Sequence, residues 1–235
     1  SQTIYAVYGE LNVPIFDRLN LNLAGRYEDY GSKGGSTFNP QARAKFQATP
    51  WFAVRGSVGT TFRAPPQETV APVSSISGLV VFGQTLPVET RGNPDLGPEK
   101  AFSYSVGGIL EVGRFRASID YWNYELKDIL TPEPLGNVLA AAFIAAHFAF
   151  SSGCSSSTIT RVTITQINGP KINTSGLDFI VDYSLPDVAG GTVNLGLTAT
   201  YVDKYSVGAL SIGGLVVPGS AFEAAGKANI LTVAY

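Results

Sequence analysis

The residues that could carry out acid–base or nucleophilic chemistry are few in this chain of 235 residues. Catalysis of this kind usually needs a histidine close to a serine or a carboxylate. The only histidine is His147, within the alanine-rich stretch AAFIAAHFAF. His147 could contact a ligand from a loop, or it could belong to a short loop helix with no part in binding. Since one isolated histidine is a poor basis for an active site, the sequence predicts that the protein is not an enzyme.

Metal-ligating residues are equally sparse. Cys154 is the only cysteine, so the chain cannot form an internal disulfide or a site with several cysteine ligands. Cys154 is therefore either paired outside this chain or a solitary loop thiol. Asp95 and Glu99 flank Pro98 and could form a carboxylate pair, but the surrounding Asn, Asp, Gly and Pro residues favour a turn. The sequence predicts no metal site and no cofactor.

The composition favours strands in a membrane. Charged residues are 14% of the chain, against about 25% in typical soluble domains. The chain contains 26 glycines, 11 tyrosines and 13 phenylalanines, which favours strands and turns. The longest apolar run, Val138 to Phe150, is shorter than the roughly 20 residues that a membrane-spanning helix needs. A net charge of −2 makes nucleic acid an improbable partner.

Alternation of apolar and polar residues indicates the strands. In Thr192 to Asp203, for example, Val193, Leu195 and Leu197 lie on one face, and Asn194 and Thr198 on the other. This two-residue period over about ten residues is typical of transmembrane barrel strands. Nine such segments are predicted: Thr3 to Val13, Leu19 to Tyr30, Thr37 to Ala48, Trp51 to Arg63, Ala101 to Val112, Arg114 to Leu126, Thr160 to Leu185 with a break at Asn168-Gly169-Pro170, Thr192 to Asp203, and Ala225 to Tyr235.

The connections between these strands alternate in length. Short turns, such as the one at Gly113, alternate with long loops over residues 64–100, 131–159 and 204–224. Outer-membrane barrels have short periplasmic turns and long external loops, so we expect the three long loops to face the exterior.

Two motifs flank the first long loop. The word FRAP contains Phe62, Arg63, Ala64 and Pro65, and the word GNPDLGPE contains Asn93, Pro94, Leu96, Pro98 and Glu99. Together with NTSGLDFIVDY at 173–183, they resemble the middle-to-late barrel region of TonB-dependent outer-membrane receptors. The resemblance extends over nearly the whole chain, and it implies a structural role for the residues of the two motifs.

The resemblance implies an all-β fold, an antiparallel transmembrane β-barrel of 22 strands to which this chain contributes about nine. Residues 1–235 would form a single partial barrel domain, and the plug domain and closing strands would be absent from it. The function implied is active uptake of a scarce ligand. That ligand would be an iron chelate such as a ferric siderophore, or else cobalamin or a glycan. The implied location is the outer membrane of a Gram-negative bacterium, in contact with lipid. Energy would come from the TonB–ExbB–ExbD system through the plug.

Ligand contacts are expected on the polar face of the wall and on the loops. The two-residue alternation places Arg26, Glu28 and Arg63 on the face that is expected to line the lumen. They could contact a ligand or the plug, or they could be paired charges of a solvated wall. The weaker candidates are Arg91, Trp122, Tyr124 and His147.

Two other functional classes remain open from the sequence. A passive porin would have the same strands around a lumen without a plug. A soluble β-sandwich binding module would keep the alternation but bury its apolar faces against each other.

Overall fold

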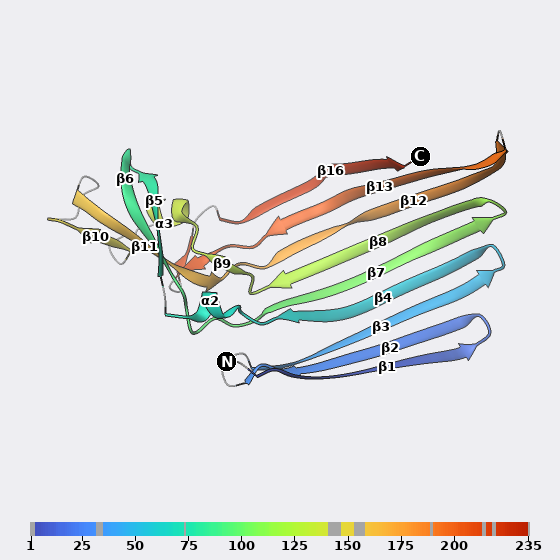
Figure 1. Ribbon diagram of the computed structural model, residues 1–235, viewed down its shortest axis with the longest axis horizontal. Helices are drawn as coiled ribbons and strands as arrows, with labels where there is room; N and C mark the ends of the chain where they lie inside the picture. Colours follow the sequence, from blue (N-terminus) through green and yellow to red (C-terminus); the bar gives the residue numbers. More distant parts are fainter. Residues whose placement is uncertain are drawn as a thin grey trace.

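The computed structural model describes residues 3–31, 35–72, 74–140, 147–152, 158–188, 190–212, 215–217 and 220–234. Its main feature is one curved antiparallel sheet of nine strands, hereafter the wall (Figure 1). The strands follow in the order β1-β2-β3-β4-β7-β8-β12-β13-β16, and each wall strand therefore pairs with the next wall strand along the chain. Their bounds are β1 Tyr5–Phe16, β2 Leu19–Asp29, β3 Ser36–Thr49, β4 Phe52–Arg63, β7 Glu99–Val112, β8 Phe115–Lys127, β12 Ile172–Val188, β13 Gly191–Val207 and β16 Phe222–Ala234.

The register of the strands separates the wall into an apolar face and a polar face. Leu195 and Leu197 of β13 pair with Tyr183 and Val181 of β12, so these apolar side chains share one face. The intervening positions, among them Thr198, lie on the opposite face. The face alternation predicted from the sequence is therefore confirmed.

The apolar face is open rather than packed. Val106 is 52% exposed, Leu195 47% and Leu197 40%. A β-sandwich would bury such side chains against a second sheet. The β-sandwich alternative is therefore wrong, and the pattern is that of a barrel wall whose apolar side chains face lipid.

The two ends of the wall differ. At one end, short turns join the strands, and Gly113 provides the turn between β7 and β8 with a φ of +60°, which favours glycine. At the other end lie the long connections (Figure 1). We call these the turn end and the loop end. Neither of the described helices, α2 Gln67–Val70 and α3 Leu135–Ala140, is long and apolar enough to span a bilayer.

The long connections form a second, smaller sheet at the loop end, hereafter the loop sheet. It contains β5 Ser74–Val81, β6 Gln84–Arg91, β10 Phe148–Phe150 and β11 Ile159–Asn168, in the order β10-β11-β6-β5. The strand β9 Leu130–Pro132 pairs with β11, and a separate short ribbon is formed by β14 Ser211–Ile212 and β15 Leu215–Val216. One face of the loop sheet covers a cluster of buried side chains: Val81, Leu86, Val88, Val138, Phe148, Ile159, Val162, Ile164, Leu210 and Val217.

The segment Thr160 to Leu185, predicted as one interrupted strand of the wall, is two strands in two different sheets. The break lies at residues 169–171 and overlaps the predicted break at Asn168-Gly169-Pro170, but β11 before it belongs to the loop sheet. The prediction was wrong because β11 pairs in parallel with β6, matching Val162 with Val88, and both side chains are buried. Pairing with so distant a strand leaves no local trace in the alternation of β11 itself.

Candidate ligand-binding surfaces

The polar face of the wall carries ion pairs between and within strands. On β2, Arg26 Nη2 lies 2.7 Å from Glu28 Oε1. Arg63 at the loop end of β4 pairs with Glu99, its cross-strand neighbour on β7. The strand register places Arg26, Glu28 and Arg63 on the same face, as expected from the sequence. Each of these charges is thus compensated within the wall, and each arginine is still more than half exposed.

One ion pair on this face reaches across a whole strand. Arg55 Nε of β4 donates to Asp120 Oδ1 of β8 at 2.7 Å, passing over Gly107 of β7. A Cβ atom at position 107 would lie 2.1 Å from Asp120 Oδ1. Glycine is therefore required for this close approach, and the pair ties three adjacent strands together on the polar face.

Trp122 and Tyr124 are also on the polar face, at alternate positions of β8. Their ring centroids are 5.6 Å apart. The indole N–H of Trp122 is buried, and it makes no hydrogen bond within the described residues. Tyr124 is 46% exposed. Tyr124 therefore offers an exposed aromatic surface to whatever occupies the polar side of the wall, whereas the indole N–H of Trp122 is enclosed.

The residues of the two motifs hold the base of the loops together. Asn93 Oδ1 accepts the N–H of Asp95 at 2.9 Å, and Asn93 Nδ2 donates to the carbonyl of Gln166 at 2.9 Å. Asn168 Oδ1 accepts the N–H of Gly97 at 2.8 Å, and Asn168 Nδ2 donates to the carbonyl of Gly97 at 2.8 Å. These contacts indicate a turn-forming and loop-anchoring role. The remaining motif residues lie around the end of β4 and the start of β7: Ala64 and Pro65 follow β4, and Pro94, the buried Leu96 and Pro98 precede β7. Phe62, near the end of β4, has its ring centroid 5.4 Å from that of Tyr30.

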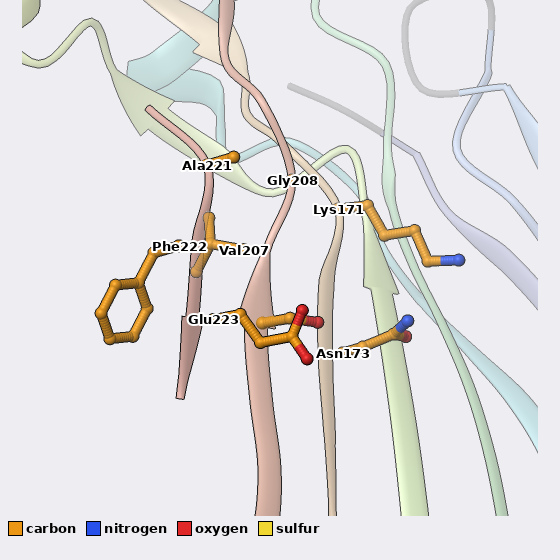
Figure 2. Close-up of a pocket in the computed structure, with 8 residues that line it drawn as sticks. Lys171, Asn173, Val207, Gly208, Ala221, Phe222 and Glu223 are labelled. Atoms are coloured by element: carbon orange, nitrogen blue, oxygen red, sulfur yellow. The ribbon is translucent and has the colours of Figure 1, made fainter. Parts of the chain in front are cut away.

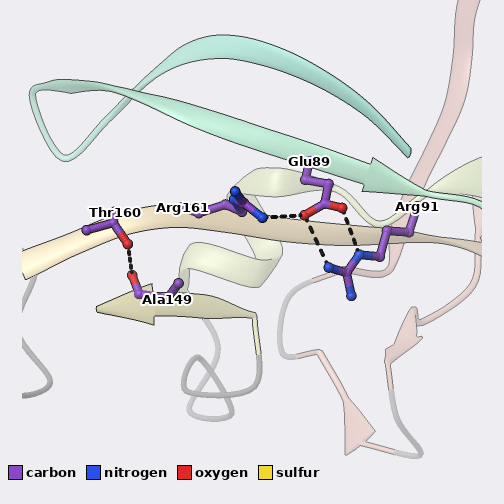
Figure 3. A network of polar contacts seen from close by, with 5 residues as sticks. All are labelled: Glu89, Arg91, Ala149, Thr160 and Arg161. Carbon is purple, nitrogen blue, oxygen red and sulfur yellow. Dashed lines mark hydrogen bonds and ion pairs between the residues drawn. The ribbon is translucent and has the colours of Figure 1, made fainter. Parts of the chain in front are cut away.

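The polar face of the loop sheet carries two arginines around one carboxylate (Figure 3). Arg91 Nε lies 3.0 Å from Glu89 Oε1, and Arg161 Nη1 lies 3.3 Å from Glu89 Oε2. Glu89 is buried, whereas the two arginine side chains are 54% and 49% exposed. The hydrogen bond from Arg91 is the main cause that lowers the pKa of Glu89, so the carboxylate stays charged and fixes both guanidinium groups. Arg91 was predicted from the sequence, but Glu89 and Arg161 were not.

His147 lies in the loop region just before β10, outside the described helix α3. Its Nε2 is 3.2 Å from Glu133 Oε2, and the same carboxylate oxygen accepts the backbone N–H of Thr165 at 2.9 Å. Glu133 is 5% exposed. The contact links β10, β9 and β11, and a role in ligand binding stays a prediction. Cys154 lies outside the described residues.

Two hollows open at the loop end of the wall. The larger, of about 470 Å³, is lined by Lys171 just before β12 and by residues of β12, β13 and β16, among them Asn173 and Glu223 (Figure 2). The smaller, of about 310 Å³, is lined by residues of β3, β4, β7 and β8, among them Phe38 and Lys100. The candidate residues thus fall into two groups, with Arg26, Glu28, Arg63, Trp122 and Tyr124 on the polar face of the wall and Arg91 and His147 in the loop region.

Comparisons with known proteins agree with this architecture. Over 132 residues the chain is 30% identical to the iron-regulated outer membrane virulence protein of Vibrio cholerae, covering 56% of this chain and 19% of that protein. The chain thus spans about a fifth of this relative's length.

Solved structures share the fold at low sequence identity. The siderophore receptor PirA from Pseudomonas aeruginosa is 17% identical with a TM-score of 0.65, over 87% of this chain and 36% of PirA. The RagAB peptide importer is 16% identical with a TM-score of 0.63, over 97% of this chain and 25% of that chain. The family model described as "TonB dependent receptor-like, beta-barrel" matches residues 1–232. The chain therefore belongs to the TonB-dependent receptor family and forms part of its β-barrel in the outer membrane.

Proposed function

We propose that this chain forms part of the wall and mouth of a receptor that actively takes up a scarce ligand, such as a ferric siderophore. Energy would be supplied by TonB–ExbB–ExbD through a plug domain outside this chain. Membership of the TonB-dependent receptor family supports the transport class. The similarity to an iron-regulated protein and to a siderophore receptor supports an iron chelate as the ligand.

The observation that carries the proposal is the arrangement of Arg91, Glu89 and Arg161 on the loop sheet. One buried carboxylate orients two half-exposed guanidinium groups, so the surface keeps an excess positive charge. Guanidinium groups bind planar oxygen anions through paired hydrogen bonds. Iron chelates with catecholate or carboxylate oxygens present such groups. Arg91 and Arg161 would capture the chelate at the mouth, and Arg26, Arg63, Trp122 and Tyr124 would meet it or the plug farther inside.

The test is uptake by the full-length receptor in a strain that lacks its own copy. The probes are ⁵⁵Fe bound to a tris-catecholate, ⁵⁵Fe bound to a tris-hydroxamate, and cyanocobalamin. Replacing Arg91 and Arg161 with alanine should lower uptake of the transported chelate, supplied below saturation, at least about tenfold, because each charge-assisted hydrogen bond contributes about 1.5–3 kcal/mol to its binding. The matched control is Arg116→Ala, since Arg116 is also exposed and paired, with Glu111, but lies at the turn end. Equal loss in both variants would contradict a binding role for the loop sheet.

The passive porin alternative is tested in the same strain. An energised receptor should stop taking up the chelate when TonB is deleted or when the proton gradient is collapsed. Uptake that continues under both conditions, together with steady ion conductance in a planar bilayer, would instead support the porin.

A further inference from the structure

The apolar face of the wall has a sharp boundary near the loop end. On β7, every second residue of this face from Val112 to Phe102 is apolar or glycine. The next residue on the same face toward the loop end is Lys100. Ten residue steps at about 3.4 Å, on a strand tilted by about 40°, span roughly 26 Å, close to the apolar band of about 25 Å in outer-membrane barrels. On β8 the boundary lies between Tyr121 and Glu125. Lys100 therefore lies where the bilayer interior gives way to the headgroups.

Lysines gather just beyond this boundary. Lys127 Nζ lies 2.8 Å from Glu125 Oε1, and Lys171 Nζ lies 2.6 Å from Glu125 Oε2. Lys100 is the cross-strand neighbour of Lys127 and makes no ion pair within the described residues. The register places Lys100, Glu125 and Lys127 on the same face as Phe102 and the apolar band, and Lys171 joins them through its ion pair with Glu125. We call Lys100, Glu125, Lys127 and Lys171 the boundary cluster. Three ammonium groups and one carboxylate leave it with an excess of positive charge.

The arginines of the wall have a different distribution. The register places five of them on the polar face: Arg26, Arg43, Arg55, Arg63 and Arg116. Lysines of the boundary cluster thus stand out as cations on the lipid side of the wall. A long aliphatic stem with a charged end is suited to this position, since the stem covers apolar surface while the ammonium group reaches the polar layer.

The smaller hollow lies beside the boundary cluster. The pairing of β3 with β4 is continuous only up to Gln41 and Gly59, although both strands continue toward the loop end. Pro40, the next residue of β3, has no N–H to donate to a ladder. The hollow of about 310 Å³ lies where the two strands separate, and it is lined by Phe38, Phe62 and Phe102 as well as by Lys100, Glu125 and Lys127. Phe38 is 63% exposed.

We propose that the boundary cluster and this hollow form a binding site for an anionic lipid of the outer leaflet, with lipid A as the occupant. The phosphate of its headgroup would contact Lys100 and Lys127, with Lys171 on the far side of Glu125. The aromatic side chains of the hollow would contact the first part of an acyl chain. Two features favour a lipid over a soluble anion: the cluster faces the same side as the apolar band, and cations meet aromatic side chains at headgroup depth.

The experiment uses the full-length receptor in detergent micelles, and lipid binding is measured by native mass spectrometry. The probes are bisphosphorylated lipid A, dephosphorylated lipid A, phosphatidylglycerol and inorganic phosphate. Bisphosphorylated lipid A should bind more tightly than the other three. Because one surface lysine contributes about a fivefold change in affinity for an anionic headgroup, Lys100→Gln should weaken binding about fivefold. The triple variant Lys100→Gln, Lys127→Gln, Lys171→Gln should weaken it at least about tenfold.

Two controls accompany these variants. Lys45→Gln removes a lysine from the polar face and should leave lipid binding unchanged. Heat-dependent migration on gels reports whether each variant is folded, and Lys100→Gln breaks no ion pair, so it tests the site even if the triple variant does not fold. Equal binding of dephosphorylated lipid A, competition by millimolar phosphate, or unchanged binding by Lys100→Gln would each overturn the proposal. Since no transport is measured, these outcomes are independent of the proposed uptake function.

Discussion

At the scale of single residues, Asn168 joins two of the long connections at the base of the loops. Its carboxamide accepts the N–H of Gly97 and donates to the carbonyls of Gly97 and Asp128, with distances of 2.8–2.9 Å. It therefore joins the connection between β4 and β7 to the one between β8 and β12. The buried Leu96 lies next to this contact, so the base of the loops is fixed by both hydrogen bonds and packing.

Replacing Asn168 with alanine should loosen the loops without unfolding the barrel. The change removes the partner of the half-buried N–H and carbonyl of Gly97, and each such hydrogen bond contributes about 0.5–1.5 kcal/mol. Limited proteolysis of the full-length protein should therefore cleave the loop sheet several times faster, while heat-dependent migration on gels stays as in the wild type. Asn194→Ala is the control, since Asn194 bonds Ser184 near the turn end. Equal protease resistance in both variants would contradict an anchoring role for Asn168.

At the scale of elements, each wall strand separates two environments. Leu197 and Thr198 are adjacent on β13, similarly exposed in this chain, and directed to opposite faces. In the barrel, the first side chain meets lipid and the second meets the polar interior. A charge is costly in hydrocarbon and tolerated in water, so neighbouring positions should respond very differently to the same substitution.

Leu197→Arg should destabilise the full-length protein by roughly 2–4 kcal/mol if Leu197 lies near the bilayer midplane. Thr198→Arg is the matched variant and should cost much less, because its side chain enters the polar interior. Urea unfolding in lipid vesicles gives the two free energies. Similar losses for both variants would show that the assignment of the two faces is wrong.

The sequence predicted the wall well because its signal is local. A two-residue period identifies a strand and its two faces from a dozen residues, as in the stretch from Val193 to Leu197. The loop sheet could not be predicted in this way, because β11 finds its partner in β6, far earlier in the chain. Arg91 was recognised as a candidate. Arg161, which reaches the same carboxylate of Glu89, was missed because it lies on β11 and meets Glu89 only through this distant pairing.

At the scale of the whole molecule, the chain has two parts with different cores. The wall has its apolar side chains on an exposed face, which requires lipid, whereas the loop sheet buries its own cluster of aliphatic and aromatic side chains. The loop sheet can therefore keep its shape in water beyond the membrane. This arrangement supports a mouth built from folded loops, and it makes the orientation of the two ends the central question.

Two exposed turns at opposite ends of the chain's fold report that orientation. The hairpin of β5 and β6 ends in a turn at Phe82 and Gly83, where Phe82 is 50% exposed, and β7 and β8 are joined by the turn at Gly113. An epitope tag inserted at Gly83 should bind antibody on intact cells, because the loop end faces the exterior. The same tag at Gly113 should bind antibody only after the outer membrane is permeabilised, since outer-membrane barrels place their short turns in the periplasm. Both insertions fall in exposed turns, so each should leave the strands paired, and heat-dependent migration on gels checks this. Antibody binding at Gly113 on intact cells would reverse the orientation, and it would place the arginines of the loop sheet in the periplasm, where they could not capture an external ligand.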